Sequence, residues 1–386
     1  MTDTRRRRFQ LQTCLGSGAF GEVYRAVMTS PGGIRSTVAV KILHAAVNEQ
    51  GVRRLRDEAR WLGALDHPSI VKVHDLTRLD DCVALVAEYV DGQDLEGCFR
   101  SPGGVPPKVL VEILGRLASA LDQAWNGVSS VTGEPLQLVH RDIKPMNVRI
   151  GRHGTVKLLD FGVARAAGIE REAETQAGVA IGTWRYLAPE ALAGERNHPA
   201  TDVFALGCTG YRVLAGKSLY DDIAMIVQKQ LSSEPARHTE LVANRLSLLP
   251  PSTPPGLAVL LGKMLAFNPA ERPTAGEVGA ACDALLDGLT GEDLRRWCAG
   301  RAWPDEVAQR GRLVGRELIE GAAEASDLRP PSEVATAMVV RDEPTPAPSE
   351  GGNTRLLVGL AAFAVLFALC AGVGGCAMGW GIALAT

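Results

Sequence analysis

Residues 140–147 read His-Arg-Asp-Ile-Lys-Pro-Met-Asn, and this stretch decides how the rest of the chain is interpreted. The first three residues alone could be a chance match. The lysine-proline pair that follows, and the asparagine five residues after the aspartate, make chance a poor explanation. Other short motifs flank the stretch, in a fixed order and at workable separations. They are Gly16-Ser17-Gly18-Ala19-Phe20-Gly21-Glu22-Val23, Val38-Ala39-Val40-Lys41, Asp160-Phe161-Gly162 and Ala188-Pro189-Glu190.

Each motif is weak evidence alone, but together they are typical of ATP-dependent protein kinases. The chain resembles a bacterial-type (Hanks-type) Ser/Thr protein kinase over about residues 9–288. That resemblance implies an α+β, bilobal fold, with a small β-rich N-lobe that carries one helix and a larger helical C-lobe. The residue pattern agrees, because short β-rich runs dominate up to about Glu88 and helical periodicity begins near Lys108. The expected helix of the N-lobe covers residues 50–65.

Glycines at positions 16, 18 and 21 let the backbone of a tight hairpin approach phosphates without a side-chain clash. Alone, the pattern also fits a flexible hairpin or a dinucleotide-binding turn. The latter requires a helix after the glycines, whereas β-rich sequence follows here, so the context favours the kinase hairpin. In that hairpin Val23 supplies an apolar cover for the adenine.

The resemblance assigns the other ATP-binding positions. Lys41 holds the α- and β-phosphates and pairs with Glu58 on the N-lobe helix. The Glu88 carbonyl and the Val90 amide contact the adenine edge. Leu15 and Ala39 complete the expected ATP-binding set.

It also implies the catalytic and metal-binding roles. Asp142 orients the acceptor hydroxyl and accepts its proton, while Lys144 steadies the transferring phosphate. Asn147 and Asp160 bind Mg²⁺, so the expected cofactors are ATP and Mg²⁺. The spacing matters because the nucleophile, the phosphoryl group and the metal must line up.

Supporting positions follow from the same resemblance. Glu190 pairs with Arg272 in a buried ion pair, and Asp202 braces the catalytic loop from a helix start. Lys144 and Thr183 are what Ser/Thr-specific members carry, so the expected acceptors are Ser and Thr hydroxyls of protein substrates.

Regulation is expected around residues 163–181. Arg141 precedes the catalytic aspartate, and such an arginine often pairs with a phosphorylated residue of this segment. The segment has a single hydroxyl residue, Thr175. Autophosphorylation of Thr175 and an unmodified acidic loop both stay open.

Two positions near the adenine depart from the common pattern. Ala87 falls where a larger residue often guards the back of the pocket, so bulky adenine analogues should be accepted. Arg149 replaces an aliphatic residue beneath the adenine; its methylene stem can form the apolar floor while the guanidinium reaches water.

Composition narrows the function classes. A net charge of −3 over 386 residues gives no reason to expect a nucleic-acid partner. The eight cysteines are scattered without a Cys-x-x-Cys pair, which argues against a zinc site and a disulfide framework.

Composition and helix signals divide the chain into segments. A helix start is expected at Thr290, with Asp293 three residues on. The expected segments are a basic tail (1–8), the kinase domain (9–288), a helical segment (289–326), a Pro/Gly-rich linker (327–354), a transmembrane helix (355–380) and a short tail (381–386).

The C-terminal segment from Leu356 to Thr386 has no charged residue. Its length exceeds the roughly 20 residues needed to cross a bilayer. Residues 356–376 are expected to span the membrane once, and use of ATP puts the kinase domain on the cytoplasmic side. Gly375 and Gly379 have the spacing of a helix-pairing motif, but chance also produces it in so glycine-rich a stretch. A homodimer therefore stays open.

Two alternative functions remain. A pseudokinase scaffold would be signalled by loss of Lys41, Asp142, Asn147 or Asp160, and all are present. A small-molecule phosphotransferase is disfavoured by Ala188-Pro189-Glu190 and by Arg272.

Overall fold

The structure is a computed structural model of the whole chain. It describes residues 6–18, 21–43, 63, 65–129, 133–161, 183–195, 198–304 and 311–321. The chain divides into two units, residues 1–323 and 324–386, and every described residue belongs to the first.

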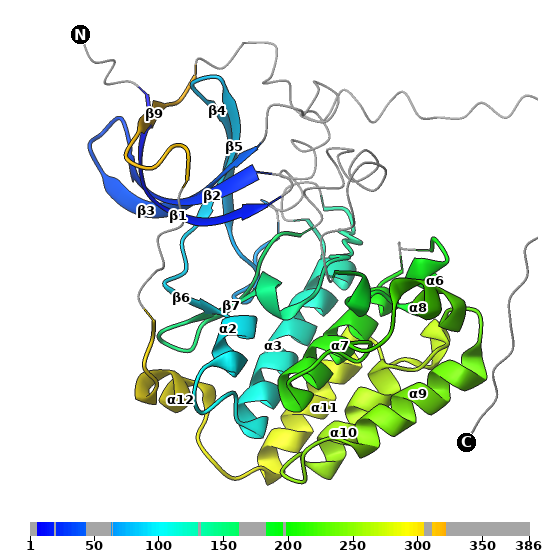
Figure 1. Cartoon of the computed structure of the whole chain (residues 1–386). Helices are drawn as coiled ribbons and strands as arrows, with labels where there is room; N and C mark the ends of the chain where they lie inside the picture. The colour runs from blue at the N-terminus through cyan, green and yellow to red at the C-terminus, as the bar shows by residue number, and fades with distance from the viewer. Residues whose placement is uncertain are drawn as a thin grey trace, which may run out of the picture. The chain divides into compact units, whose positions relative to one another are not determined.

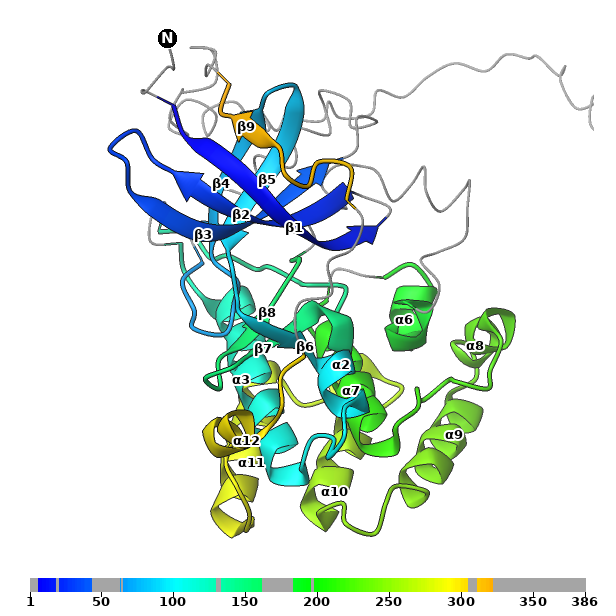
Figure 2. The same ribbon diagram turned by 60° about the vertical axis from the view of Figure 1, so that its left-hand side comes forward.

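An antiparallel sheet forms the N-lobe (Figures 1 and 2). Within the described residues its order is β4-β5-β3-β2-β1-β9. Buried and partly exposed positions alternate along β2 and the second half of β3, as expected for strands with one face on a core. The strands are β1 (Arg8–Gly18), β2 (Gly21–Thr29), β3 (Arg35–Leu43), β4 (Val73–Leu79), β5 (Cys82–Glu88) and β9 (Glu317–Ile319).

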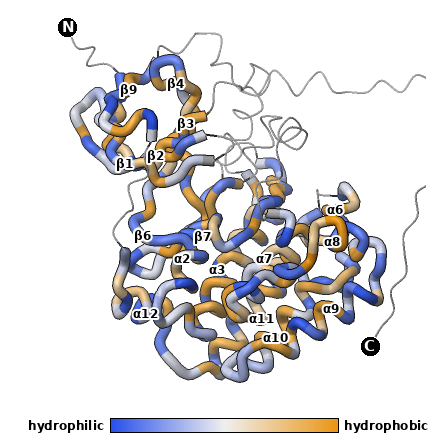
Figure 3. The backbone as a smooth tube through the Cα atoms, in the orientation of Figure 1, coloured by the Kyte–Doolittle hydropathy of each residue, from blue (hydrophilic) through white to orange (hydrophobic). Residues whose placement is uncertain are grey.

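The C-lobe is helical, with a small sheet in the order β6-β7-β8. Hydropathy mapped on the backbone shows apolar residues recurring along its helices (Figure 3). The sheet has β6 (Gly92–Asp94), β7 (Val148–Gly151) and β8 (Val156–Leu158). The α-helices are α2 (Leu95–Arg100), α3 (Pro107–Asn126), α6 (Pro189–Leu192), α7 (Ala200–Ala215), α8 (Met225–Leu231), α9 (Pro235–Ser247), α10 (Pro255–Met264), α11 (Ala275–Gly288) and α12 (Leu294–Gly300).

Helix α7 lies at the centre of the C-lobe and is buried along nearly its whole length. A Cβ at Gly210 would come within 2.9 Å of Leu261 on α10 and 3.2 Å of Leu114 on α3, so this glycine allows the close packing of three helices. The helix ends at Gly216 with a φ of 71°, in the left-handed conformation that glycine adopts without cost. A rigid α7 fixes Asp202 in its first turn.

The segment expected to be helical from 289 to 326 is described at residues 289–304 and 311–321, and most of these residues are not helical. Only α12 is helical among its described residues, and its N-cap is Asp293, whose side chain accepts from the Arg296 amide, rather than Thr290. Residues 312–315 form turns, and β9 follows them. Gly315 has a φ of 82°, which an α-helix cannot contain, so a helix cannot continue through it. The edge of β1 that is not paired with β2 offers hydrogen-bond partners, and the extended chain of β9 uses them.

Two expected helices fall on residues that the structure does not describe. The N-lobe helix over 50–65 is described only at Gly63 and Leu65, and residues 356–376 are not described at all. Among residues 6–321, as far as these are described, no helix is both long and apolar enough to cross a bilayer.

Candidate active site

A pocket of about 270 Å³ lies between the N-lobe sheet and the start of the C-lobe. Strands β1, β2, β3 and β5 supply its upper wall, and β7 and the residues after β8 supply its floor. Its lining residues are Leu15, Gly16, Val23, Ala39, Lys41, Val71, Val73, Leu85, Ala87, Glu88, Tyr89, Val90, Asp94, Met146, Arg149, Leu159, Asp160 and Phe161.

The glycine-rich hairpin is formed by the end of β1 and the start of β2, where Gly18 pairs with Gly21. A Cβ at Gly21 would lie 2.0 Å from the Ile42 carbonyl oxygen, so the close approach to β3 requires glycine there. A Cβ at Gly16 would meet no described atom within 4 Å, so protein packing does not demand this glycine. Its missing side chain leaves the backbone open toward the pocket.

Lys41 on β3 reaches across the pocket to Asp160, with 2.8 Å between Nζ and Oδ1. Partial burial raises the pKa of the Asp160 carboxyl, but the charge and hydrogen bond of Lys41 outweigh it and hold that pKa below its ordinary value. Asp160 is therefore ionised at neutral pH. Glu58, the expected helix partner of Lys41, lies outside the described residues.

Glu88 and Val90 connect the two lobes. The Glu88 carboxylate accepts from the Lys72 amide at 2.7 Å and pairs with Lys157 of β8 at 2.5 Å. Arg149 lines the pocket, as expected for a residue beneath the adenine, and its Nε donates to the Val90 carbonyl at 3.2 Å. Nothing local in the sequence indicates either contact, because both join distant parts of the chain.

The catalytic-loop candidates lie together. Lys144 Nζ donates to both carboxylate oxygens of Asp142, at 3.0 and 2.8 Å. Asn147 Nδ2 donates to the Asp142 main-chain oxygen at 2.7 Å and to its Oδ2 at 2.9 Å. Asp142 is thus fixed from two sides, and the Asn147 amide oxygen is directed away from it.

Asp202 holds the backbone of this loop, as the resemblance implies. Its carboxylate accepts from the amides of His140 at 2.6 Å and Arg141 at 2.8 Å. Burial raises the pKa of Asp202, while His140 and the two backbone hydrogen bonds act in the opposite direction. Arg141 has a φ of 69°, a conformation that costs a non-glycine residue of order 1 kcal/mol or more, and the hydrogen bonds to Asp202 hold it there.

A second set of contacts joins the catalytic loop to Asp160. The Leu159 amide donates to the Asn147 carbonyl at 2.8 Å, and His140 Nε2 lies 2.8 Å from the Leu159 oxygen. The Phe161 ring is buried edge-to-face against His140, with 4.6 Å between ring centroids. These contacts hold Leu159, the residue before Asp160, against the main chain of Asn147, although Asp160 and Asn147 belong to different motifs.

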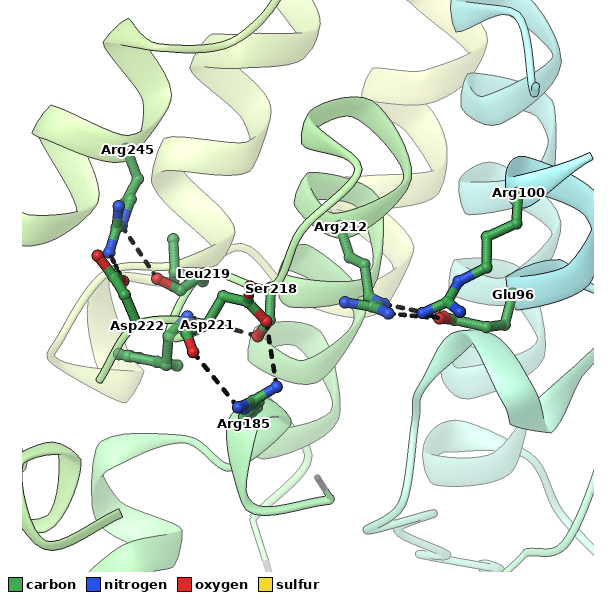
Figure 4. Close-up of polar contacts among 10 residues, drawn as sticks. Glu96, Arg100, Arg185, Arg212, Ser218, Leu219, Asp221, Asp222 and Arg245 are labelled. Carbon is green, nitrogen blue, oxygen red and sulfur yellow. Dashed lines mark hydrogen bonds and ion pairs between the residues drawn. The ribbon is translucent and has the colours of Figure 1, made fainter. Parts of the chain in front are cut away.

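The segment after residue 182 is attached to the C-lobe by ion pairs. Arg272 forms a bidentate pair with Glu190, at 2.6 and 2.8 Å, and its side chain is fully buried. Arg185 pairs with Asp221 at 3.1 Å on the surface (Figure 4). Thr183 begins the short 3₁₀ turn Thr183–Tyr186, and Thr175 lies outside the described residues.

Figure 4 also shows a contact that the sequence did not reveal. Arg212 on α7 reaches Glu96 on α2 with two hydrogen bonds, and Arg100 pairs with the same carboxylate at 2.8 Å. Arg212 also lies over the Phe99 ring, 5.4 Å from its centroid. The spacing of Glu96 and Arg100 on one helix face is visible in the sequence, but the link to α7 requires the fold.

The sequence model of the protein kinase domain family matches residues 9–281. The chain belongs to the protein kinase family. It is 31% identical over 340 residues to the serine/threonine-protein kinase PknH of Mycobacterium tuberculosis, covering 86% of this chain and 48% of that protein. It is 32% identical over 287 residues to PknA of the same species, covering 72% of this chain and 60% of that protein.

The chain thus spans about half the length of the curated kinases it matches. Among solved structures, the PknI kinase domain of Mycobacterium tuberculosis has 28% identity and a TM-score of 0.51, over 72% of this chain and 95% of that domain. These findings confirm the kinase fold with a β-rich N-lobe and a helical C-lobe.

The kinase family uses ATP with a divalent metal ion, and the donor atoms here fit such an ion. Asp160 offers a carboxylate with a lowered pKa, and Asn147 offers an amide oxygen because its nitrogen is occupied by Asp142. In the described part of the chain, no three His, Cys, Asp or Glu side chains gather into a metal cage. One or two protein oxygens are the usual share at a site that phosphate oxygens complete.

Proposed function

We propose that this kinase transfers the γ-phosphoryl group of ATP, with Mg²⁺, to Ser and Thr hydroxyls of proteins. The convergence of Lys41, Asp142, Asn147 and Asp160 supports this most directly. Lys41 meets Asp160 at the pocket, Asn147 meets Asp142, and the Leu159–Asn147 backbone bond joins the two pairs. A pseudokinase scaffold would have no need for this set.

Each residue has a definite task in this proposal. Lys41 holds the phosphates, and Asp142 orients the acceptor hydroxyl and takes its proton. Lys144, paired with Asp142, neutralises negative charge beside the acceptor. Mg²⁺, held by Asn147 and Asp160, would neutralise phosphate charge.

Ser/Thr specificity and protein substrates are supported by separate observations. Lys144 and Thr183 are the residues expected for Ser/Thr acceptors, and the matched relatives are named Ser/Thr-protein kinases. The buried Glu190–Arg272 pair fixes the segment where a protein substrate would lie. A small-molecule phosphotransferase is the less supported alternative.

The test uses the full chain with labelled ATP, Mg²⁺ and an acceptor protein rich in Ser and Thr. Asp142→Asn and Lys41→Met should each lose labelling by several orders of magnitude, because each removes a group that acts in the transition state. Asp283→Asn, the same change at an exposed position on α11, is the matched control and should keep full activity. Labelling that persists in Asp142→Asn, or that falls on Tyr, contradicts the proposal.

Membrane anchoring is a further part of the proposal. Residues 356–376 are apolar enough to span a bilayer once, and ATP use would keep the kinase domain cytoplasmic. The full chain should resist alkaline extraction from membranes. Replacing Val365 and Leu366 by Arg should release it without loss of phosphotransfer, and release of the parent chain by alkali would remove this part.

Thr175 is proposed as the site of autophosphorylation, with Arg141 as the partner of the phosphate. Phosphopeptide mapping after incubation with ATP and Mg²⁺ should find phosphate on Thr175 and none on an Asp142→Asn chain. A phosphate-free Thr175 in an active sample favours the alternative, an unmodified acidic segment.

A further inference from the structure

Residues 311–321, here called the strap, return from the C-lobe to the N-lobe sheet. They lie beyond residue 281, where the match to the kinase family model ends. Within the strap, β9 runs antiparallel to β1, with Leu318 opposite Phe9 (Figure 2). A segment outside the matched kinase domain thus supplies a strand to the sheet that covers the nucleotide pocket.

The strap is firmly held along β1. Leu318 is 3% exposed and belongs to the N-lobe core, together with Phe9. Two backbone hydrogen bonds continue past the strand, from the Leu11 amide to the Arg316 oxygen and from the Gly315 amide to the Leu11 oxygen, both 2.9 Å. Burial of a leucine side chain is worth about 2 kcal/mol, so this contact is not incidental.

The strap also reaches the far edge of the same sheet. The Asp80 amide donates to the Ile319 oxygen at 2.8 Å, and the Gly321 amide donates to the Arg78 oxygen at 2.9 Å. Arg7 hydrogen-bonds both Glu320 and Asp75. Burial raises the pKa of the Glu320 carboxyl, but its bonds to Arg7 and Thr77 more than offset this and hold the pKa below its ordinary value.

One end of the strap contacts the glycine-rich hairpin directly. The buried Tyr24 hydroxyl donates to Glu22 Oε2 at 2.6 Å and accepts from the Leu313 amide at 3.2 Å. A Cβ at Gly311 would lie 2.6 Å from Cys14 and 2.7 Å from Tyr24, so the strap approaches the hairpin as closely as a glycine permits. Tyr24 therefore joins the strap to the hairpin.

The contact between Tyr24 and the strap, here called the junction, lies on the side of the hairpin away from the nucleotide pocket. Val23 lines the pocket, and successive side chains of a strand point to opposite faces, so Tyr24 points away from the pocket and into the N-lobe core, where it is fully buried. Tyr24 pairs with Cys14 across the hairpin, and the next pair, Val23 with Gly16, lines the pocket. A shift of Tyr24 would move the phosphate-covering backbone directly.

We infer that the strap and Tyr24 are positioning residues for ATP binding. Through the Leu313–Tyr24–Glu22 hydrogen bonds, the strap holds the glycine-rich hairpin on the face away from the pocket and so sets the distance between the hairpin backbone and the phosphates of ATP. This inference rests on the proposed kinase function. It gives a residue outside the ATP pocket a defined effect on the affinity for ATP.

The test compares full-length Tyr24→Phe with full-length Tyr220→Phe. Both changes remove one buried hydroxyl. The hydroxyl of Tyr24 makes two hydrogen bonds, to Glu22 and Leu313, whereas that of Tyr220 makes one to His238 in the C-lobe, away from the hairpin. Tyr24→Phe should raise the KM for ATP about fivefold, the loss expected for the one hydrogen bond that joins Leu313 of the strap to the hairpin, with kcat and the KM for acceptor protein changed less than about twofold. Tyr220→Phe should lower the unfolding midpoint without changing the KM for ATP.

Leu318→Ala, which loosens β9 from the core, supplies a second variant. Its effect on the KM for ATP should not add to that of Tyr24→Phe, because both act through one junction. Without nucleotide, the amides of residues 21–24 should exchange hydrogen faster in both variants than in the parent chain. In Tyr220→Phe their exchange rates should equal those of the parent chain. Unchanged exchange, or an unchanged KM for ATP in Tyr24→Phe, overturns the inference.

Hydrogen exchange also separates the two proposals. An inactive parent chain with faster hairpin exchange in Tyr24→Phe would defeat the kinase function and leave the support of the hairpin standing. An active parent chain with unaltered hairpin exchange in Tyr24→Phe would defeat the support of the hairpin and leave the kinase function standing.

Discussion

Ala87 on β5 faces the nucleotide pocket beside another alanine. Its register partner on β3 is Ala39, and both residues line the pocket. Two methyl side chains side by side leave room where larger residues would close the back wall. The small size of the residue at this point is a property that a single substitution can test.

We expect the kinase to accept ATP carrying a benzyl group on the adenine amine, with kcat/KM within about tenfold of that for ATP. Ala87→Met should reduce use of the analogue by about 100-fold while use of ATP changes little, since a few misfitting methylenes in a pocket carry such penalties. Steady-state kinetics with both nucleotides measures this. Rejection of the analogue by the parent chain would show that the space is closed by something other than residue 87.

His238 on α9 is a buried neutral base. It is 1% exposed, its Nε2 lies 2.9 Å from the Tyr220 hydroxyl, and the Phe267 ring packs edge-to-face on it. Burial lowers the pKa of His238 to about 4, the Arg272 charge adds to this, and Glu190 acts in the opposite direction. The unfolded chain therefore binds a proton at this residue at a higher pH than the folded chain does.

Because the folded pKa is below the unfolded value near 6.5, this residue lowers stability as the pH falls from about 6.5 to about 4. We expect it to cost about 2–3 kcal/mol of unfolding free energy between pH 7.5 and pH 4.5. Urea unfolding of the parent and of His238→Gln at both pH values separates the loss of unfolding free energy due to His238 from the loss due to the carboxylates. Equal losses in the two chains would contradict the expectation.

At the scale of elements, two arginine–carboxylate pairs hold the same segment but differ in burial. Arg272 also donates to the main-chain oxygens of Ala266, Phe267 and Ala200, and its side chain is fully buried. The side chain of Arg185 is 33% exposed and that of Asp221 46%. Removing one partner of a buried pair leaves a charge without compensation, whereas solvent replaces an exposed partner.

Arg272→Ala should therefore cost about 3–5 kcal/mol of unfolding free energy, and Arg185→Ala less than about 1 kcal/mol. Urea denaturation of the full chain at neutral pH measures both. Similar values for the two variants would mean that the segment is held mainly by other contacts.

Local motifs explain which parts of the site were predictable. Asp142, Lys144 and Asn147 fall within six residues, so one stretch specifies them, and the structure brings them into contact. The helical periodicity from Lys108 likewise predicted α3, whose apolar positions are buried. Such features depend on neighbours in the sequence.

The unpredicted features depend instead on distant partners. Strand β9 is only three residues long, and its pairing is decided by the free edge of β1 at the other end of the described chain. The Arg149–Val90 bond joins β7 to the connection between the lobes. Propensity cannot reveal such contacts, because the same residues would be acceptable in a helix or a loop.

At the scale of the molecule, the folded kinase unit extends beyond the matched family range. Residues 9–281 match the family, and 9–288 were expected as the domain, but the strap at 311–321 completes the N-lobe sheet. A chain ending at residue 288 leaves the core around Phe9 without Leu318. Domain limits drawn from the motifs alone are therefore too short.

We expect a chain ending at 288 to unfold at least about 5 °C below a chain ending at 323, because it loses a buried leucine and the edge hydrogen bonds of β1. Thermal unfolding of the two fragments beside the full chain measures the difference. Equal midpoints would show that the strap adds no stability, whatever it does for the hairpin.

The backbone bond from the Glu320 amide to the Arg7 oxygen, 3.0 Å long, brings the first and last described parts of the catalytic unit side by side. Circular permutation is thus geometrically open: a few glycines could join residue 321 to residue 6, and new termini could be cut in the exposed turn between β2 and β3. Such a rearranged gene would yield an enzyme whose former ends are sealed into a loop.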